Sequence, residues 1–177
     1  KLYELKKFDY NEIMSLMNNC SICINLIGIL YETKKQKFNT IHSEFPYMLS
    51  KIAKKTKIEK FIHLSSLGIE QATKSRYAKS KLDGEMKIKQ NFENSIILKP
   101  SVVYSVDDNF TTNFMTLLSR LPIMPLYYEG RTKFSPIHVN DLTDIIFGLI
   151  ENKHNNLVLE CIGPEVLTFK DIIKILL

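Results

Sequence analysis

The chain has 177 residues, 45% of them hydrophobic, which is enough to bury one core and is typical of a globular rather than a disordered protein. Its formal net charge of +5 comes mainly from lysines scattered along the sequence. No apolar run approaches the roughly 20 residues of a membrane-spanning helix, so we expect no transmembrane segment. The chain starts with Lys1 and without a recognisable signal peptide, and we expect it to be part of a longer protein.

The basic residues concentrate locally only in two short runs, residues 34–37 and 54–57. Recognition of nucleic acid usually relies on clustered arginines with interleaved aromatic residues, and the only arginines are Arg76, Arg120 and Arg131. We therefore predict solvated faces and no nucleic-acid partner. Contact of a basic face with anionic lipid headgroups stays open.

The three cysteines, an odd number, favour a reducing compartment over a disulfide framework. Cys20 and Cys23 have the spacing of a redox pair or of half a zinc site. A redox motif should open a helix, however, whereas Cys23 falls within an apolar strand pattern. Cys161 has no further ligand nearby that would complete a zinc site. The pattern predicts buried thiols and no metal.

Short runs rich in isoleucine and valine alternate with segments of helical period, which predicts parallel strands joined by crossover helices. The predicted strands are residues 2–6, 22–27, 60–64, 95–99 and 157–162. A first helix covers residues 38–53, whose apolar side chains keep a spacing of three to four despite Pro46. A second helix covers residues 75–91. The strands lack strict alternation, as expected when a parallel sheet is covered on both faces.

The pattern changes after Pro100 to loops with shorter helices, predicted at residues 109–120 and 140–151, with Asn140 as the N-cap of the latter. Thr168 and Asp171 have the spacing of a capping box that opens a final helix. We therefore predict an α/β fold, a Rossmann-like doubly wound parallel sheet in one domain over residues 1–177. Residues 1–99 form its cofactor-side sheet and residues 100–177 a small, mixed, substrate-side lobe.

A constellation of hydroxyl and amine groups gives the strongest chemical signal. Ser65 and Ser66 follow a buried strand, and Tyr77 and Lys81 lie four residues apart, hence on one face of the next helix. A phenol is a poor proton donor and acceptor at neutral pH, and a nearby ammonium lowers its pKa. Lys81 would also bond a nicotinamide ribose, while a serine would polarise a substrate carbonyl. By itself the Tyr77–Lys81 spacing is common without any function, and the preceding Ser65-Ser66 strengthens it.

At this point the sequence resembles the extended and atypical short-chain dehydrogenase/reductases, the NAD-dependent epimerase/dehydratase-like proteins. Within that group it resembles the family of NADPH-binding accessory subunits of respiratory complex I and their bacterial relatives. The resemblance covers nearly the whole chain. Its motifs, in family order, are Ile24-Asn25-Leu26-Ile27-Gly28, Tyr31-Glu32-Thr33-Lys34, Phe38, Glu59-Lys60-Phe61-Ile62-His63, Ser75-Arg76-Tyr77, Gly84-Glu85, residues 134–141 and Gly163-Pro164.

The resemblance implies roles for individual residues. It implies that Ser66, Tyr77 and Lys81 stand where active epimerases carry their catalytic residues, with Ser65 as the neighbouring candidate. The implied cofactor-binding residues are Asp9 at the adenine, Asn25, Leu26, Ile27 and Gly28 at the adenosine and ribose, Tyr77 and Lys81 at the nicotinamide ribose, and Pro100, Ser101, Val102 and Val103 beside the nicotinamide. Without the family, Asp9 reads equally as a capping residue, Gly28 as a turn and Pro100 as a strand terminator.

Two features depart from the family pattern. The glycine-rich turn that seats a pyrophosphate on a helix N-terminus is not in this chain, which holds six glycines in all. We therefore expect the first two strands to lie outside the chain and this piece alone to bind cofactor poorly. Ser105 stands at a position where the family usually has a glycine. The sequence therefore gives no prediction for the substrate-side loop.

The stretch from residue 110 to residue 126 is more apolar than an exposed connection should be. We expect it to cover the cleft, to pack on another lobe, or to face a partner or membrane surface. Its apolar residues are Phe110, Phe114, Leu117, Leu118, Leu121, Ile123, Met124 and Leu126.

Two functions follow from the resemblance. One is an accessory or assembly subunit of respiratory complex I that holds NADP(H) or NAD(H) structurally, in contact with other subunits. It would lie on the mitochondrial matrix side or in the bacterial cytoplasm, peripheral to the inner membrane. The other is an active NAD(P)-dependent reductase, epimerase or dehydratase that uses Ser66, Tyr77 and Lys81. A scaffold of this fold that binds no cofactor is a third reading.

Overall fold

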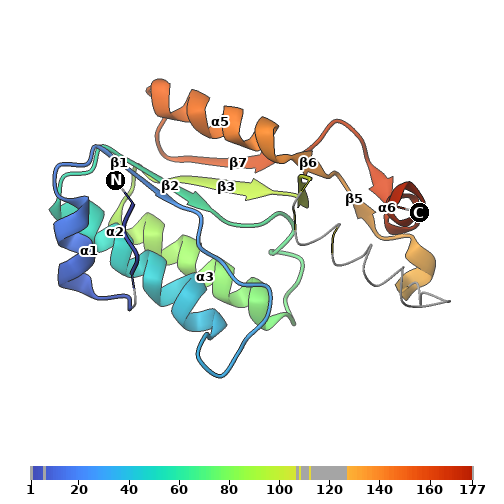
Figure 1. The fold of residues 1–177 in the computed structure, drawn as a ribbon, viewed down its shortest axis with the longest axis horizontal. Helices are drawn as coiled ribbons and strands as arrows, with labels where there is room; N and C mark the ends of the chain where they lie inside the picture. Colours follow the sequence, from blue (N-terminus) through green and yellow to red (C-terminus); the bar gives the residue numbers. More distant parts are fainter. Residues whose placement is uncertain (1, 6, 107, 109–111, 113–126, 177) are drawn as a thin grey trace. The chain divides into compact units, whose positions relative to one another are not determined.

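The structure is a computed structural model that describes residues 2–5, 7–106, 108, 112 and 127–176 (Figure 1). The chain forms two compact units. The first comprises Lys1–Lys99 and Asn152–Leu159, and the second comprises Pro100–Glu151 and Glu160–Leu177. The predicted change of character after residue 99 therefore coincides with a boundary between units. The assignment of both to a single domain stays a prediction.

The first unit is built on a sheet with strand order β1-β2-β3-β7. Its strands are β1 (Ile22–Asn25), β2 (Lys60–Leu64), β3 (Ile96–Pro100) and β7 (Leu157–Cys161). The first three are parallel, with Ile24 opposite Ile62 and Ile62 opposite Ile96. Every residue of β3 and all but the last of β2 are buried, so these two central strands show no alternation. The predicted parallel sheet is confirmed.

The helices of the first unit lie together along one face of this sheet (Figure 1). They are α1 (Tyr10–Met17), the π-helical turn η1 (Thr40–Glu44), α2 (Phe45–Lys55) and α3 (Arg76–Asn91). Helix α2 connects β1 to β2 and α3 connects β2 to β3, which are the crossovers expected of a Rossmann-like fold. Phe45, Ile52 and Ile88 pack with Phe61 and Ile97 of the sheet to form the core.

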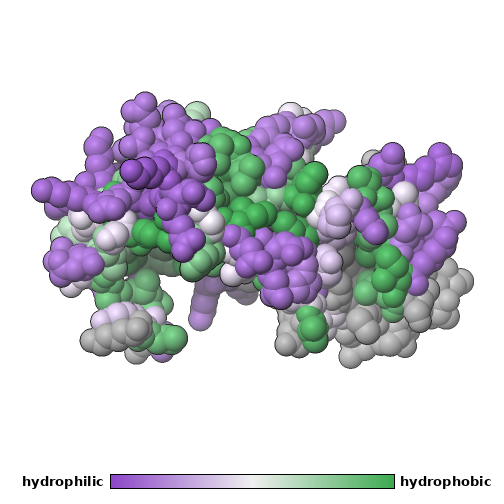
Figure 2. Space-filling view, turned by 90° about the horizontal axis from the view of Figure 1, so that it is seen from above, coloured by the Kyte–Doolittle hydropathy of each residue, from purple (hydrophilic) through white to green (hydrophobic). Residues whose placement is uncertain are grey.

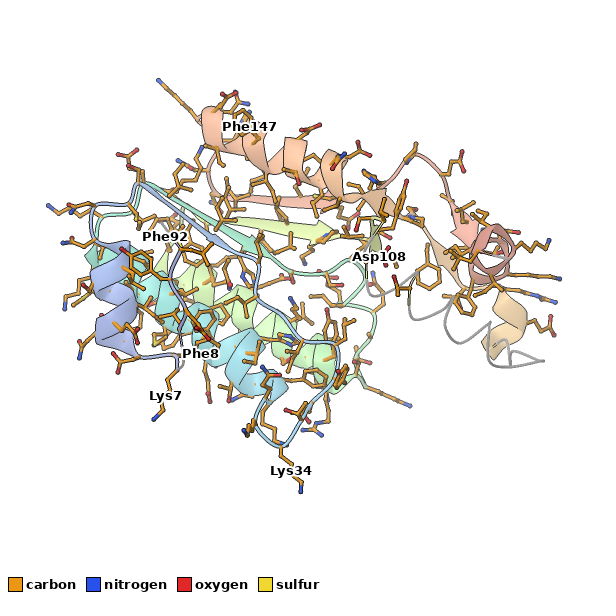
Figure 3. All side chains as sticks on the ribbon, viewed as in Figure 1. Lys7, Phe8, Lys34, Phe92, Asp108 and Phe147 are labelled. Carbon is orange, nitrogen blue, oxygen red and sulfur yellow. The ribbon has the colours of Figure 1, made fainter. Side chains whose placement is uncertain are left out.

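Aromatic side chains extend this core toward its ends. The ring of Phe8 stacks on that of Phe45 with centroids 3.9 Å apart, and the rings of Phe92 and Phe61 lie 5.9 Å apart. Phe8 and Phe92 are labelled in Figure 3, which also shows Lys34 extending away from the loop that follows β1. The exposure of Lys34 agrees with the prediction that its basic run is solvated.

Most predicted elements of the first unit are confirmed. Strand β2 has its predicted bounds, β3 is shifted by one residue, and β1 and β7 end earlier than predicted. Ser75 caps α3 by accepting a hydrogen bond from the Ala78 N–H. Pro46 is the second residue of α2, directly after the π-helical turn η1, at whose end the Phe45 N–H donates to the carbonyl oxygen of Thr40. Helix α1, which no predicted range included, was missed.

The predicted strand at residues 2–6 is wrong. Residues 2–5 have no regular structure, and Lys6 lies outside the described residues. Leu2 is 99% exposed, whereas Leu5 packs against the core beside the helices. The apolar side chains of this segment indicated burial, but a strand also needs a neighbour that pairs with its backbone, which a hydrophobic pattern does not reveal.

The described part of the second unit contains short strand pairs, two α-helices and a 3-10 turn. Strand β4 (Val103–Tyr104) pairs in parallel with β6 (Ile137–His138), and β5 (Lys133–Phe134) pairs antiparallel with β8 (Leu167–Thr168). The helices are α5 (Val139–Glu151), α6 (Phe169–Leu176) and the 3-10 turn η2 (Tyr127–Gly130). The predicted helix at 109–120, apart from Thr112, and the whole apolar set from Phe110 to Leu126 lie outside the described residues.

The two predicted helix starts in this unit have different outcomes. The capping box is confirmed, because Thr168 Oγ1 accepts from the Asp171 N–H at 3.2 Å and Asp171 Oδ2 accepts from the Thr168 N–H at 3.1 Å. Asn140 is not an N-cap, because α5 already begins at Val139. The ring nitrogen Nδ1 of His138 instead accepts from the Asn140 N–H at 3.2 Å.

The thiols and the surface complete the fold. Cys20, Cys23 and Cys161 form no disulfide with one another. Cys161 is buried, but Cys20 is exposed, so the prediction of buried thiols is wrong for it. Burial raises the pKa of Cys23 to about 12, which makes this thiol a poor nucleophile.

Figure 2 shows exposed hydrophobic residues among hydrophilic ones on one face of the molecule. No helix in the described parts of the chain is long and apolar enough to cross a bilayer.

Candidate cofactor-binding site

The site lies in the first unit, where β1 and β2 end. In a parallel sheet the carboxyl ends of neighbouring strands meet at one edge, which is where α/β proteins bind ligands. Asn25 is the last residue of β1 and is buried. Its Nδ2 lies 3.0 Å from Nδ1 of His63 in β2, and its Oδ1 accepts from the Ile27 N–H at 3.1 Å. The Asn25 amide therefore shapes the turn from Asn25 to Gly28 and fixes it to β2.

Lys81 of α3 lies against this turn. Its Nζ donates to the carbonyl oxygen of Leu64, the last residue of β2, at 3.1 Å. A Cβ placed on Gly28 would lie 3.4 Å from the same Nζ, so the backbone of Gly28 passes directly beside the ammonium. Burial lowers the pKa of Lys81 to about 8, and the Glu85 carboxylate acts in the opposite direction. The structure thus brings together two residues predicted for the site, Gly28 and Lys81.

Tyr77 lies one turn before Lys81 on α3 and is half-buried. Its side chain is hydrogen-bonded to that of Ser66, which follows β2. Burial raises the pKa of Tyr77, although the Ser66 bond acts in the opposite direction. The sequence led us to expect a phenol whose pKa is lowered by the Lys81 ammonium, and the net shift has the other sign because burial outweighs the polar contacts. Tyr77 is consequently a neutral phenol at physiological pH.

Ser65, the second candidate serine, makes a different contact. Its hydroxyl donates to Glu85 Oε1 on α3, and its backbone N–H donates to the carbonyl oxygen of Leu98 on β3 at 2.7 Å. Ser65 is buried, whereas Ser66 is only partly buried. Ser66 is therefore the hydroxyl that faces Tyr77, and Ser65 belongs to the support beneath it.

His42 was not among the predicted site residues. Its Nε2 accepts from the Ile29 N–H at 3.0 Å, and its Nδ1 lies 3.0 Å from Ser80 Oγ, which donates to the carbonyl oxygen of Tyr77 at 2.7 Å. Since Nε2 is an acceptor, the ring proton sits on Nδ1. Burial lowers the pKa of His42 to about 4, and the charge of Lys81 acts in the same direction.

The His42 ring also packs edge-on against Tyr77, with centroids 5.2 Å apart, and stacks with Phe38 at 5.4 Å. His42 follows Phe38 by four residues, so the helical spacing already placed it on the buried face. That spacing was the signal that could have found it.

His63 is the second histidine near Lys81. It is 1% exposed, and its Nε2 has no hydrogen-bond partner within the described residues. Burial lowers the pKa of His63 to about 3, with further lowering by the charges of Lys81 and His42. His63 is therefore neutral, and Lys81 is the charged group among these three.

The remaining predicted residues belong to three segments of the chain. Asp9 caps α1, since its Oδ1 accepts from the Glu12 N–H at 2.9 Å. Leu26 and Ile27 are exposed, at 57% and 42%. Pro100 ends β3, and Pro100, Ser101, Val102 and Val103 belong to the second unit. Their assigned contacts with a nucleotide stay predictions.

Comparison with known proteins places this site in context. No family model matches the chain. The chain is 25% identical over 170 residues to the mitochondrial NADH dehydrogenase (ubiquinone) 1 alpha subcomplex subunit 9 of Dictyostelium discoideum, covering 96% of this chain and 47% of that protein. The Arabidopsis thaliana subunit of the same name is 25% identical over 171 residues, covering 95% of this chain and 42% of the subunit.

The chain is thus similar in sequence to this complex I subunit over almost its whole length. It spans less than half the length of these two proteins. A ceramide reductase from Caulobacter vibrioides is also 25% identical, over 126 residues, which cover 71% of this chain and 39% of the reductase.

Solved structures show the same fold at lower identity. UDP-glucuronic acid 4-epimerase from Bacillus cereus, solved with UDP-glucuronic acid and NAD, superposes with a TM-score of 0.77 at 21% identity, covering 95% of this chain and 62% of the epimerase. A dTDP-4-dehydrorhamnose reductase from Clostridium acetobutylicum superposes with a TM-score of 0.79 at 16% identity, covering 96% of this chain and 66% of the reductase. The fold is therefore that of NAD-dependent epimerases, dehydratases and reductases, as the sequence predicted.

Proposed function

We propose that this chain is part of an NAD(P)(H)-binding protein of the complex I accessory-subunit kind, in which the cofactor is held structurally. The observation that carries the proposal is the contact between Gly28 and Lys81. A position without a side chain lies beside an ammonium, at the carboxyl edge of a parallel sheet. A nucleotide ribose and its phosphates can approach a backbone closely only where no side chain intervenes.

The described residues fit the ribose end of such a nucleotide. Lys81 uses one of its three N–H groups on Leu64, which leaves donors that can bind the ribose hydroxyls of the nicotinamide half. Tyr77 is a neutral phenol that can bind the same ribose. The turn from Asn25 to Gly28 would border the adenosine and its ribose, with Asp9 at the adenine. Pro100, Ser101, Val102 and Val103 would flank the nicotinamide.

The state of Tyr77 favours binding over turnover. A bound nicotinamide would supply hydride chemistry, for which the phenol should give up or accept a proton near neutral pH. Burial raises the pKa of Tyr77, so its phenolate is disfavoured. The Ser66 bond only partly opposes this effect. A phenol that stays protonated serves as a fixed hydrogen-bond donor.

The curated relatives support the proposed partner and location. Relatives from Dictyostelium and Arabidopsis are mitochondrial subunits of NADH dehydrogenase, with which we expect the whole protein to assemble. We therefore propose the matrix side of the inner mitochondrial membrane as the location, with NADP(H) or NAD(H) as the cofactor. In a bacterium the corresponding location is the cytoplasmic face of the membrane.

An active NAD(P)-dependent reductase, epimerase or dehydratase is the second candidate. The hydrogen bond between Ser66 and Tyr77, with Lys81 one turn away, is the observation that favours it. The similarity to a ceramide reductase adds an enzyme to the relatives. In this reading Ser66 orients a substrate carbonyl or alcohol and Tyr77 exchanges its proton.

The test is to purify the full-length protein and identify its bound nucleotide after denaturation by mass spectrometry. The proposal expects about one nucleotide per protein, retained through gel filtration, and co-purification with NADH dehydrogenase subunits. A free protein that oxidises NADPH with a carbonyl or sugar-nucleotide substrate would overturn the structural role and establish the enzyme. A protein that neither carries nor binds nucleotide would exclude both functions.

A further inference from the structure

A chain of buried charges runs beneath the site in the first unit. Lys99 of β3 is 6% exposed, and its Nζ lies 3.0 Å from Glu85 Oε2 of α3. The same Nζ forms a second ion pair, with Glu70 in the loop after β2. The other Glu85 oxygen, Oε1, accepts the hydrogen bond from Ser65. Both carboxylate oxygens of Glu85 are therefore bonded. Oε1 accepts from the Ser65 hydroxyl, and Oε2 pairs with the buried ammonium of Lys99.

Glu85 and Lys81 act on neighbouring atoms. They lie four residues apart on α3, and both are buried, with Glu85 6% exposed and Lys81 5% exposed. Lys81 binds the carbonyl oxygen of Leu64 and Glu85 binds the hydroxyl of Ser65, so one helix face holds two consecutive residues where β2 ends. Ser66, the hydroxyl bonded to Tyr77, follows directly. The position of Ser66 thus depends on the residue that Glu85 holds.

We propose that Glu85 is the positioning residue of the cofactor site, which holds Ser65 at the end of β2 and places a carboxylate one turn from Lys81 on α3. This inference rests on the proposed nucleotide-binding function of Lys81. The proposed function gives Glu85 no contact with the nucleotide, so the inference adds a residue to the site. Glu85 acts through Ser65 and Lys81 rather than on the cofactor itself.

Among the described residues, the carboxylate of Glu85 is the charge that raises the pKa of Lys81 against the effect of burial. Glu85 acts on Lys81 from the same helix, while His63 of β2 and His42 of η1 couple to it from the sheet and the preceding helical turn. The pKa of His42 is lowered to about 4 and that of His63 to about 3, so both rings stay neutral near pH 7. Tyr77 shares the helix face as a neutral phenol. Glu85 is the negative charge that opposes the burial of Lys81.

The experiment measures the protonation of Lys81 directly, without nucleotide. The full-length protein is produced with ¹³C,¹⁵N-labelled lysine, and the side-chain resonance of Lys81 is assigned with a Lys81→Arg variant and titrated with pH. Glu85→Gln keeps an oxygen for Ser65 and removes the charge, so the titration midpoint of Lys81 should fall. A midpoint in Glu85→Gln that equals the wild-type one overturns the proposal.

Two variants separate charge from loss of structure. Lys99→Met removes the cation that neutralises Glu85, and the Lys81 midpoint should then rise, opposite to the effect of Glu85→Gln. Glu70→Gln is the matched control, because Glu70 pairs with the same Lys99 but is not among the charges that act on Lys81. It should leave the midpoint unchanged. Shifts of the same sign in Glu85→Gln and Lys99→Met would show a merely structural role.

Nucleotide binding provides the second readout. If the Lys81 pKa falls by one unit from about 8, the charged fraction at pH 8 falls about fivefold, and the Kd for NADPH should rise by that factor. At about pH 6 the two proteins should bind equally, since Lys81 is charged in both. A wild-type protein that binds no nucleotide refutes the proposed function, whereas the NMR titration still decides the role of Glu85.

Discussion

The ammonium of Lys81 is bonded to the carbonyl oxygen of Leu64 at 3.1 Å, so the helix residue is attached to the end of strand β2 by a contact within the chain itself. This attachment fixes the orientation of the Lys81 side chain. Little side-chain freedom then remains to be lost on binding, which favours affinity.

Replacing Lys81 by Met should weaken nucleotide binding about 10- to 100-fold, because a hydrogen bond from a charged group contributes roughly 1.5–3 kcal/mol. Lys79 lies on the exposed face of the same helix, and Lys79→Met is the matched control. Isothermal titration calorimetry with NADPH gives both dissociation constants. Equal losses in the two variants would mean that general positive charge, rather than the position of Lys81, attracts the nucleotide.

Replacing Gly84 by Ala should destabilise the protein severely. A Cβ at this position of α3 would lie 1.9 Å from the carbonyl oxygen of His42, a backbone atom that cannot turn aside. We expect a loss of about 3 kcal/mol or more in the free energy of unfolding. For Gly148 in α5, no atom of the described residues lies within 4 Å of an added Cβ, so Gly148→Ala should instead stabilise by roughly 0.5–1 kcal/mol. Urea unfolding measures both, and a Gly84→Ala protein as stable as the wild type would contradict this packing.

Acid should destabilise the fold through His63. Its pKa is about 3 in the folded protein and about 6.5 in an unfolded chain, so the unfolded state binds the extra proton between these values. The stabilisation is complete above about pH 6.5 and is lost as the pH falls, at about 1.4 kcal/mol per pH unit between roughly pH 6 and pH 4. Urea unfolding at several pH values in this range gives the free energy of unfolding at each pH. This free energy should change less steeply with pH in His63→Gln than in the wild type, by this amount. Identical slopes would show that His63 does not titrate on unfolding.

One pair of variants distinguishes the role of Asp9 as a helix cap from its predicted contact with the adenine. Asp9→Ala removes the acceptor for the Glu12 N–H and should cost about 1 kcal/mol of stability. Asp9→Asn keeps a capping oxygen and should leave stability unchanged, since asparagine caps helices as well as aspartate does. Thermal unfolding measures the cap, and NADPH titration of the stable Asp9→Asn variant measures the adenine contact. An unchanged Kd would remove Asp9 from the cofactor site.

The sequence predicted those elements whose signals are local. Strand β2 was placed correctly because its apolar run is short and bounded, and α3 because Ser75 marks its start. Residues 2–5 were misassigned because pairing between strands depends on neighbours distant in the sequence. The start of α5 was misplaced because a histidine ring, rather than the asparagine side chain, receives the first free N–H.

In the candidate site, too, local signals were predicted and contacts between distant segments were not. Tyr77, Lys81 and Ser66 share a spacing that the sequence displays, and the structure brings Tyr77 together with Ser66. The sign of the Tyr77 pKa shift could not be predicted, since it depends on how deeply the ring is buried. The pairing of Glu85 with Lys99 was equally invisible, because it joins a helix to a strand fourteen positions later, in a contact that no periodicity encodes.

His42 connects two segments that would both border a nucleotide. One ring nitrogen receives the Ile29 N–H just beyond Gly28, and the other reaches the Tyr77 carbonyl through Ser80. Any displacement of either segment changes the electron density on a known nitrogen of a single tautomer. The ¹⁵N chemical shifts of this imidazole therefore make it a built-in spectroscopic reporter, able to register occupancy of the site without a label on the ligand.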